Sequence, residues 1–319
     1  MSQQAPAAPI PSLRPTEKMS IETAVNILRN NLMSSNADEM AIYNVLAHST
    51  LQLRGYIRAE YKRTSMNELT TDLMSRFRQE SQYFIYGLLN TGAEFDAFIL
   101  YKATEFTFNH ELVIHIFSTR THEQLLSIRA SLQRLFRVDL GRLIKMRTSG
   151  NYRKLLTFLM KNPRDLGGPK IYEIDRDRDI IKQGSHELFG VSMNLIPLFA
   201  KSSIPHIQAV VASYENVKIN LSDIQRKCMG EYSAALKSLC HCILNPTSYF
   251  ADFLKRNIYY AQIEAIIIVA CTRCEYDLGS ISNCYTAKYG TNLAQDIYNR
   301  FCGQHPAIAE GILMLLGMK

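Results

Sequence analysis

The sequence predicts an all-α protein built from four repeated units of about 70 residues each. Three observations predict this fold class. Short motifs recur in the same order at a nearly constant spacing, capping motifs precede apolar residues at helical spacing, and no sustained strand alternation competes with them. One such unit can bury only part of its apolar surface, so neighbouring units must pack against one another.

The repeats are recognised from three sets of matching motifs. Phe95–Ala97 resembles Phe250–Asp252, and Ile116–Thr121 resembles Val269–Cys274. A third motif ends at equivalent positions in the four units, namely Gln79, Gly150, Gly230 and Gly303. These positions are 71, 80 and 73 residues apart, so the longer middle interval indicates extra residues in one connection.

The elements follow in order along the chain. Residues 1–18 are rich in Pro, Ala and Gln without a period, which predicts a flexible tail. The repeats are then expected at 19–90, 91–162, 173–245 and 246–319. The linker between them, 163–172, contains Pro and Gly residues that exclude a helix, and we expect it to separate two halves of two units each.

Helix starts are predicted from capping boxes, in which a polar cap is followed three residues later by Glu or Gln. Four segments fit this pattern: Asn36–Glu39, Ser65–Glu68, Thr121–Gln124 and Asn292–Gln295. Apolar residues then follow at helical spacing, for example Leu125, Ile128 and Leu132.

Composition limits the class of protein and the kind of partner. Hydrophobic residues make up 47% of the chain, enough for a sizeable core, and the net charge of +7 favours an anionic membrane, polyanion or acidic protein. Seven cysteines, an odd number confined to Cys228–Cys302, indicate a reducing compartment. No signal peptide is visible, and apolar runs such as Ala265–Cys271 are too short to span a bilayer. We therefore expect a cytoplasmic protein whose contact with membranes is peripheral.

On these motifs the chain resembles the annexin family over nearly its whole length after residue 18. The resemblance implies an annexin-like core of four five-helix repeats forming a slightly curved disc. In annexins each repeat carries a G-x-G-T loop, and about 40 residues later an acidic residue, which together hold a calcium ion that bridges to phospholipid.

The sequence departs from that pattern in every repeat. The loops read Met33–Asn36, Phe106–Asn109, Gly190–Ser192 and Asn257–Tyr260. The acidic positions are all basic: Arg76, Arg147, Lys227 and Arg300. A cation there opposes calcium by about 4 kcal/mol per charge pair at an effective dielectric near 20. We predict no metal at the standard sites; each basic side chain either donates to the loop carbonyls as a substitute cation or points to solvent.

The same loops supply candidates for direct membrane contact: Phe106, Phe108, Ile258, Tyr259 and Tyr260. Aromatic residues favour the bilayer interface, and nearby basic residues attract anionic lipid. Alternatively, these side chains fold onto their repeats and replace packing lost with the glycines.

Acidic side chains elsewhere in the chain are candidates for unconventional calcium ligands. Candidates are Asp38, Glu39, Asp175, Asp177 and Asp179. An EF-hand beginning at Asp175 fails, because Ile180 and His186 stand at its glycine and closing glutamate positions. Interleaved arginines favour a self-paired segment instead. No cofactor is required, and weak calcium binding stays an open alternative.

Arg120 and Arg273 occupy matching positions in the second and fourth units. The resemblance implies that this arginine faces a central polar channel, where we expect a structural ion pair.

Among annexins, the chain looks closest to the alpha-giardins, which show a similar loss of standard calcium sites. The resemblance implies a peripheral phospholipid-binding protein of the membrane and cytoskeleton, at the plasma membrane or flagella. The alternative function is a linker to microtubules or flagellar filaments, or a binder of sulfated polysaccharide, through the basic surface. No nucleic-acid partner is expected. Because no Walker loop, G-x-S-x-G or dinucleotide motif occurs, the sequence predicts no enzyme.

Overall fold

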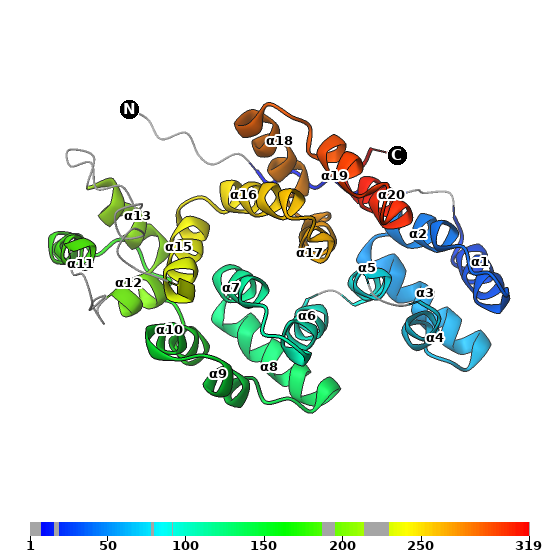
Figure 1. Ribbon diagram of the computed structural model, residues 1–319, viewed down its shortest axis with the longest axis horizontal. Helices are drawn as coiled ribbons and strands as arrows, with labels where there is room; N and C mark the ends of the chain where they lie inside the picture. Colours follow the sequence, from blue (N-terminus) through cyan, green and yellow to red (C-terminus); the bar gives the residue numbers. More distant parts are fainter. Residues whose placement is uncertain are drawn as a thin grey trace. The chain divides into compact units, whose positions relative to one another are not determined.

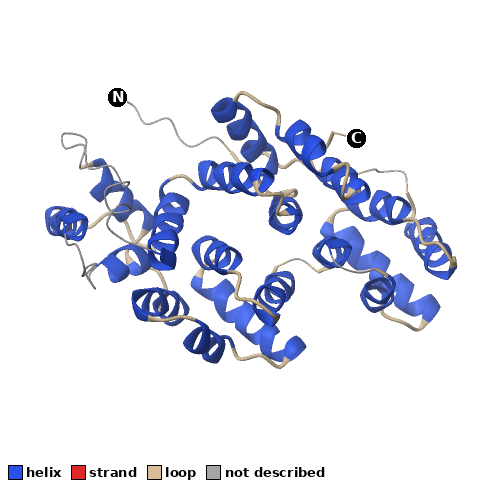
Figure 2. Ribbon diagram, viewed as in Figure 1, coloured by secondary structure: helices blue, strands red, loops and turns tan. Residues whose placement is uncertain are grey.

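The computed structural model describes residues 8–15, 19–77, 80–90, 92–186, 195–213 and 230–318. Over these ranges the chain consists of helices joined by loops, without a strand (Figures 1 and 2). The all-α prediction is therefore confirmed. Within the same ranges, no helix combines the length and the apolar composition needed to cross a bilayer.

The helices are named here by repeat, from 1 to 4 in chain order. Repeat 1 contains α1 (Ile21–Met33), α2 (Glu39–Ala47), α3 (Leu51–Ser65), α4 (Leu69–Arg76) and α5 (Glu80–Leu89). Repeat 2 contains α6 (Ala93–Glu105), α7 (His110–Thr119), α8 (His122–Phe136), α9 (Leu140–Arg147) and α10 (Gly150–Lys161). Repeat 3 contains η1 (Ile171–Glu173), α11 (Ile174–His186), α12 (Leu195–Lys201), α13 (Ile204–Ala212) and α15 (Gly230–Leu244). Repeat 4 contains α16 (Pro246–Tyr259), α17 (Ile263–Arg273), α18 (Leu278–Tyr289), α19 (Leu293–Phe301) and α20 (Pro306–Leu315).

Two of the four predicted caps stand at helix starts, and one of them forms the predicted capping box. Thr121 and Gln124 make a full capping box at the start of α8, and the Asn292 side chain accepts from the Gln295 N–H at the start of α19. The other two predictions were wrong. The cap of α2 is Asp38, and Ser65 instead ends α3 by donating its hydroxyl to the carbonyl of Tyr61.

The described chain divides into two compact units. Unit 1 joins residues 1–95 to 250–319, and unit 2 contains residues 96–249. These units do not follow the expected division at the 163–172 linker, because repeat 1 packs on repeat 4. In unit 1, α5 lies along α17 and α2 lies along α20 (Figure 1). In unit 2, α7 packs on α15 and α10 on α12.

A buried arginine organises the core of repeat 1. Arg54 of α3 is fully buried, and its guanidinium donates to the Leu46 carbonyl at 2.6 Å and to the Leu88 carbonyl at 3.0 Å. These carbonyls belong to the last turns of α2 and α5, where carbonyls lack the regular partners of a helix interior; the Leu46 carbonyl also accepts from the Ser49 N–H at 3.2 Å. Burial lowers the pKa of Arg54 from its usual value. The residue at the same place in repeat 2 is Leu125, also buried.

Part of the N-terminal tail is docked rather than flexible. The N–H groups of Ser12 and Leu13 donate to the Cys274 carbonyl, and the Ser12 hydroxyl donates to the Leu315 carbonyl at 2.6 Å. A glycine makes room for this approach, because a Cβ at Gly279 would lie 2.8 Å from the Ile10 oxygen. Segment 8–15 therefore belongs to unit 1.

Candidate functional site

The first loop of repeat 1 is held by the arginine that stands at its acidic position. Arg76 ends α4, and its Nη2 donates to the carbonyl of Ser34 at 2.5 Å and to that of Ser35 at 2.7 Å. Both carbonyls lie in the α1–α2 loop, which the Asp38 cap closes. One guanidinium thus engages two adjacent backbone oxygens, the type of ligand that a calcium loop offers.

Repeat 4 has a similar arrangement. Arg300, in the last turn of α19, donates from Nε to the Ile258 carbonyl at 3.1 Å. Ile258 lies in the last turn of α16, immediately before the loop that leads to α17. In both repeats the arginine crosses about 42 residues of sequence to reach its loop.

Repeat 2 differs at the same position. Arg147 ends α9 and is exposed, and within the described part of the chain no hydrogen bond or ion pair engages its guanidinium. For repeat 3, Lys227 and the loop Gly190–Ser192 lie outside the described residues.

The five candidates for membrane contact separate into two groups. Phe106 is 85% exposed, Tyr259 76% and Tyr260 62%, so these three rings project from their loops. Phe108 is half-buried and packs edge-on against His110, with ring centroids 4.7 Å apart. Ile258 is buried and only 7% exposed, so the expectation that it projects was wrong.

Sequence reasoning missed one exposed apolar residue of this kind. Met33, the last residue of α1, is 76% exposed beside the loop held by Arg76. The signal was present, because an apolar residue among Ser and Asn residues has no core to pack against.

Asp38 and Glu39 already have partners. Asp38 accepts from the Met40 N–H at 2.8 Å as the cap of α2. Glu39 accepts hydrogen bonds from the hydroxyls of Ser81, at 2.8 Å, and Tyr43, at 3.4 Å. Asp38 therefore serves as a helix cap, and Glu39 is held by its hydrogen bonds to Ser81 and Tyr43.

The acidic residues of α11 are largely paired with arginines. Asp175 is exposed and lies 2.7 Å from Arg178, and Asp179 is exposed on the same helix. Asp177 is buried and accepts from Nε of Arg176 at 2.8 Å, a hydrogen bond that raises the pKa of that arginine.

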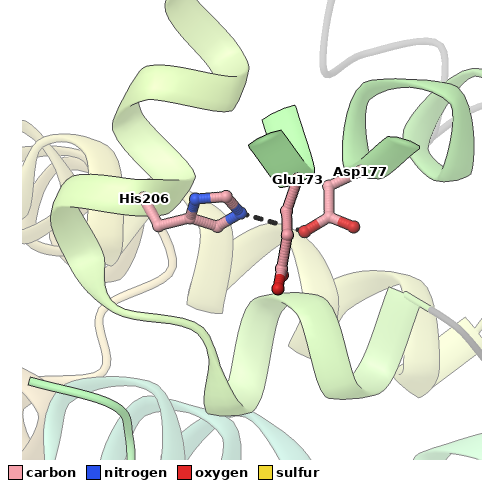
Figure 3. A group of neighbouring side chains, drawn as sticks. All are labelled: Glu173, Asp177 and His206. Atoms are coloured by element: carbon pink, nitrogen blue, oxygen red, sulfur yellow. Dashed lines mark hydrogen bonds and ion pairs between the residues drawn. The ribbon is translucent and has the colours of Figure 1, made fainter. Parts of the chain in front are cut away.

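Asp177 also belongs to a cluster with Glu173 and His206 (Figure 3). The Nε2 atom of His206 lies 2.9 Å from Oδ2 of Asp177, and one ligand-type atom from each residue lies within 4.8 Å of the others. Glu173 comes from η1, Asp177 from α11 and His206 from α13. A histidine with two carboxylates is a combination that can hold a divalent metal.

The hydrogen bonds around His206 oppose metal binding at this cluster. The Lys170 backbone N–H donates to Nδ1 at 3.1 Å, so the neutral ring carries its proton on Nε2 and donates it to Asp177. A metal at Nε2 would need that proton on Nδ1, where Lys170 already donates. Arg176 in addition donates to the carboxylates of both Glu173 and Asp177, each at 2.8 Å. The cluster is therefore best explained as an internal ion-pair network.

Arg120 and Arg273 each form an ion pair within their own unit. Arg120 contacts both carboxylate oxygens of Asp96, at 2.6 and 2.9 Å, and Arg273 makes the equivalent pair with Asp277. Burial alone would lower the pKa of Arg120, but the Asp96 carboxylate raises it above its usual value. Asp96 precedes Arg120 by 24 residues, whereas Asp277 follows Arg273 by four residues.

Comparisons with known proteins show which proteins this chain is similar to. Residues 95–159 match the family model described as Annexin. The chain is 27% identical over 300 residues to annexin A7 of Macaca fascicularis and of Homo sapiens, and the match covers 89% of this chain. It covers 61% of those relatives, so the chain spans about three fifths of their length.

Solved structures share the fold. Annexin III matches with a TM-score of 0.86 at 21% identity, covering 97% of this chain and 98% of that one. Calcium-bound alpha-14 giardin matches with a TM-score of 0.75 at 12% identity, covering 93% of this chain and 99% of that one. The annexin arrangement of helices is therefore retained at low sequence identity.

Proposed function

Because the chain is a divergent annexin-like protein, we propose that it binds anionic phospholipid membranes peripherally, without calcium at the standard annexin sites. Annexins generally bind calcium and phospholipid membranes, and nothing in the comparisons points to catalysis. In this proposal the chain binds lipid as annexins do, but arginine side chains take the place of calcium at the loops. The protein then acts at the cytoplasmic face of the plasma membrane or of flagella.

The observation that carries the proposal is the contact of Arg76 with the carbonyls of Ser34 and Ser35. A guanidinium donates up to five hydrogen bonds and stays charged at any physiological pH. It therefore satisfies carbonyls that would otherwise face a cation, and it repels calcium by about 4 kcal/mol per charge pair. Arg300 has the same role at the Ile258 carbonyl.

Attraction to the membrane then comes from the protein surface itself. The chain carries a net charge of +7, which draws it to anionic lipid, and each basic residue close to the surface adds about 1 kcal/mol. Exposed Phe106, Tyr259 and Tyr260 supply rings suited to the interfacial zone.

Co-sedimentation with phosphatidylserine vesicles tests the proposal. The protein is pelleted with vesicles in chelator and again in millimolar calcium, with neutral phosphatidylcholine vesicles as the control. Equal binding to anionic vesicles in both buffers, and little to neutral vesicles, is expected. Binding that requires calcium would contradict the proposal and return weak calcium binding to consideration.

A second candidate function, linkage to a cytoskeletal protein, is favoured by a different surface. Leu166 is 95% exposed, Ile171 79% and Tyr172 84%, all between α10 and α11. Exposed apolar residues grouped in this way are typical of protein interaction sites. Pelleting with microtubules, comparing the chain with its Leu166→Ser/Tyr172→Ser variant and adding heparin as a polyanionic competitor, tests this role. A loss in the variant supports a protein partner, and competition alone indicates polyanion binding.

A further inference from the structure

The cap position of repeat 2 differs from those of repeats 1 and 4. Arg76 through Nη2 and Arg300 through Nε each hydrogen-bond to carbonyls of their own loops. The guanidinium of Arg147 is exposed, and no described group engages it. Its N–H donors therefore face solvent and can bind an external oxyanion.

The helix that carries Arg147 is unusually basic. Arg142 and Lys145 are also exposed on α9, and no described side chain pairs with either. The helix itself carries no carboxylate, whereas α4 carries Asp72 and α19 carries Asp296 at the position equivalent to Leu143. The three cations are thus not neutralised within their own helix.

Exposed apolar side chains lie at the same end of repeat 2. Phe108 packs on His110, and His110 lies 5.5 Å from the ring of Tyr152, near the start of α10. The start of α10 lies three residues after Arg147. The rings of Phe108, His110 and Tyr152 therefore extend from the loop of Phe106 to the end of α9. Phe106 is 85% exposed there, and Met146 of α9 is 69% exposed.

We propose that this end of repeat 2 is a calcium-independent binding site for the phosphate of an anionic lipid headgroup, a proposal that rests on the proposed function. Arg147 donates to the phosphate oxygens, Lys145 adds positive charge on the same helix, and Phe106 enters the interfacial layer. The surface fits a bilayer because it combines unpaired positive charge with projecting apolar groups. A membrane offers the opposite charge and an apolar layer beneath it.

The opposite end of α10 provides a matched control. The helix spans 12 residues, so its two ends are about 18 Å apart. Its last turn lies near the start of α8, because Nδ1 of His122 is 3.3 Å from the Leu159 carbonyl. Lys161 and Lys201 are exposed at that end, without a described side-chain partner. Removing these two charges changes the net charge as much as removing Lys145 and Arg147.

The test is vesicle co-sedimentation in chelator with the full chain and two double variants. Phosphatidylserine vesicles are compared at low and physiological salt, with inorganic phosphate added separately as a competitor. Lys145→Gln/Arg147→Gln is expected to lower the partition coefficient about 25-fold, at roughly 1 kcal/mol per basic residue. Lys161→Gln/Lys201→Gln is expected to change it less than threefold.

The outcomes separate this inference from the proposed function. If the unchanged chain does not bind vesicles in chelator, the proposed function fails, and the inference with it. If the chain binds but both double variants bind equally well, or lose binding equally, the inference alone is overturned. Strong competition by millimolar inorganic phosphate would likewise overturn it, because the site would then select free phosphate rather than a lipid surface.

Discussion

In repeats 1 and 4 the arginine at the end of the fourth helix hydrogen-bonds to the loop of its own repeat. In repeat 2 the arginine at the same position is exposed and has no described partner. Each position holds an arginine, and only the surroundings differ. Arg76 and Arg300 bond to the carbonyls of their own loops, whereas Arg147 has no described partner. We therefore propose that an arginine at this position holds a loop in repeats 1 and 4 and serves binding in repeat 2.

A second difference lies behind these helix ends. In repeats 1 and 4 a tyrosine hydroxyl donates to an aspartate, Tyr61 to Asp72 at 2.7 Å and Tyr285 to Asp296 at 2.6 Å. In repeat 2 the equivalent residues are Leu132 and Leu143. A tyrosine–aspartate hydrogen bond thus links the third and fourth helices of repeats 1 and 4, whereas repeat 2 has two leucines at these positions. Losing the aspartate also leaves α9 with uncompensated positive charge.

The largest expected effect comes from giving repeat 1 the residue of repeat 2. Arg54→Leu removes the buried guanidinium that donates to the Leu46 and Leu88 carbonyls; the Leu46 carbonyl keeps the Ser49 N–H at 3.2 Å, whereas the Leu88 carbonyl loses its described donor. We expect a loss of about 3 kcal/mol in the free energy of unfolding. Urea denaturation followed by circular dichroism measures it, with the exposed Arg63→Leu as control, which should cost under about 1 kcal/mol. Equal stability of the two variants would mean that these buried hydrogen bonds have no energetic importance.

A second prediction concerns the segment 8–15, which is docked on unit 1. Gly279→Ala places a Cβ 2.8 Å from the Ile10 oxygen and 3.0 Å from the Pro11 oxygen, so the segment must move. We expect chymotrypsin to cleave after Leu13 about tenfold faster, equivalent to about 1.4 kcal/mol of docking free energy. Gly55→Ala, with no heavy atom within 4 Å of its Cβ, should leave cleavage unchanged. Identical cleavage rates in both variants would refute the docking.

The acid of α19 gives a prediction of pH dependence. Partial burial alone would raise the pKa of Asp296, but hydrogen bonds from Tyr285, Lys255 and Thr291 hold it below its usual value. A depressed carboxyl pKa stabilises the fold above the unfolded pKa of about 3.9, and that stability is lost as pH falls further. Asp296→Asn should therefore cost about 1 kcal/mol at pH 7 and less than that near pH 3. A constant difference in melting temperature between pH 3 and pH 7 would argue against this charge effect.

The smallest expected effect concerns the projecting ring of repeat 2. Phe106→Ser should lower binding to phosphatidylserine vesicles about threefold, equivalent to about 0.7 kcal/mol, because the variant loses one ring from the bilayer interface. Leu126→Ser, 45% exposed on α8 of the same repeat, is the control and should leave binding unchanged. Equal losses would show that general surface hydrophobicity, rather than this loop, determines binding.

Much of the fold could be predicted from the sequence because it depends on local patterns. The recurring motifs gave the four repeats, and Thr121 and Asn292 marked helix starts through their own backbone contacts. The pairing of repeat 1 with repeat 4 could not be predicted in this way. It depends on contacts such as α5 with α17, between residues far apart in the chain.

The candidate site was predictable only in part, for a similar reason. The residue types at Arg76, Arg147 and Arg300 are plain in the sequence, but whether each arginine reaches a carbonyl depends on the path of a distant loop. Ile258 shows the same limit: it stands next to Tyr259, yet its side chain is buried and that of Tyr259 is exposed. The docking of segment 8–15 depends on the space left by Gly279, which no local pattern reveals.

The most direct test of the account compares the two kinds of arginine in one assay. Arg147→Gln and Arg300→Gln carry the same chemical change at equivalent positions of repeats 2 and 4. In chelator, Arg147→Gln should lower phosphatidylserine vesicle binding about fivefold, while Arg300→Gln should leave it within twofold of the unchanged chain. Equal losses in both variants, or a larger loss for Arg300→Gln, would contradict the claim that these arginines act differently.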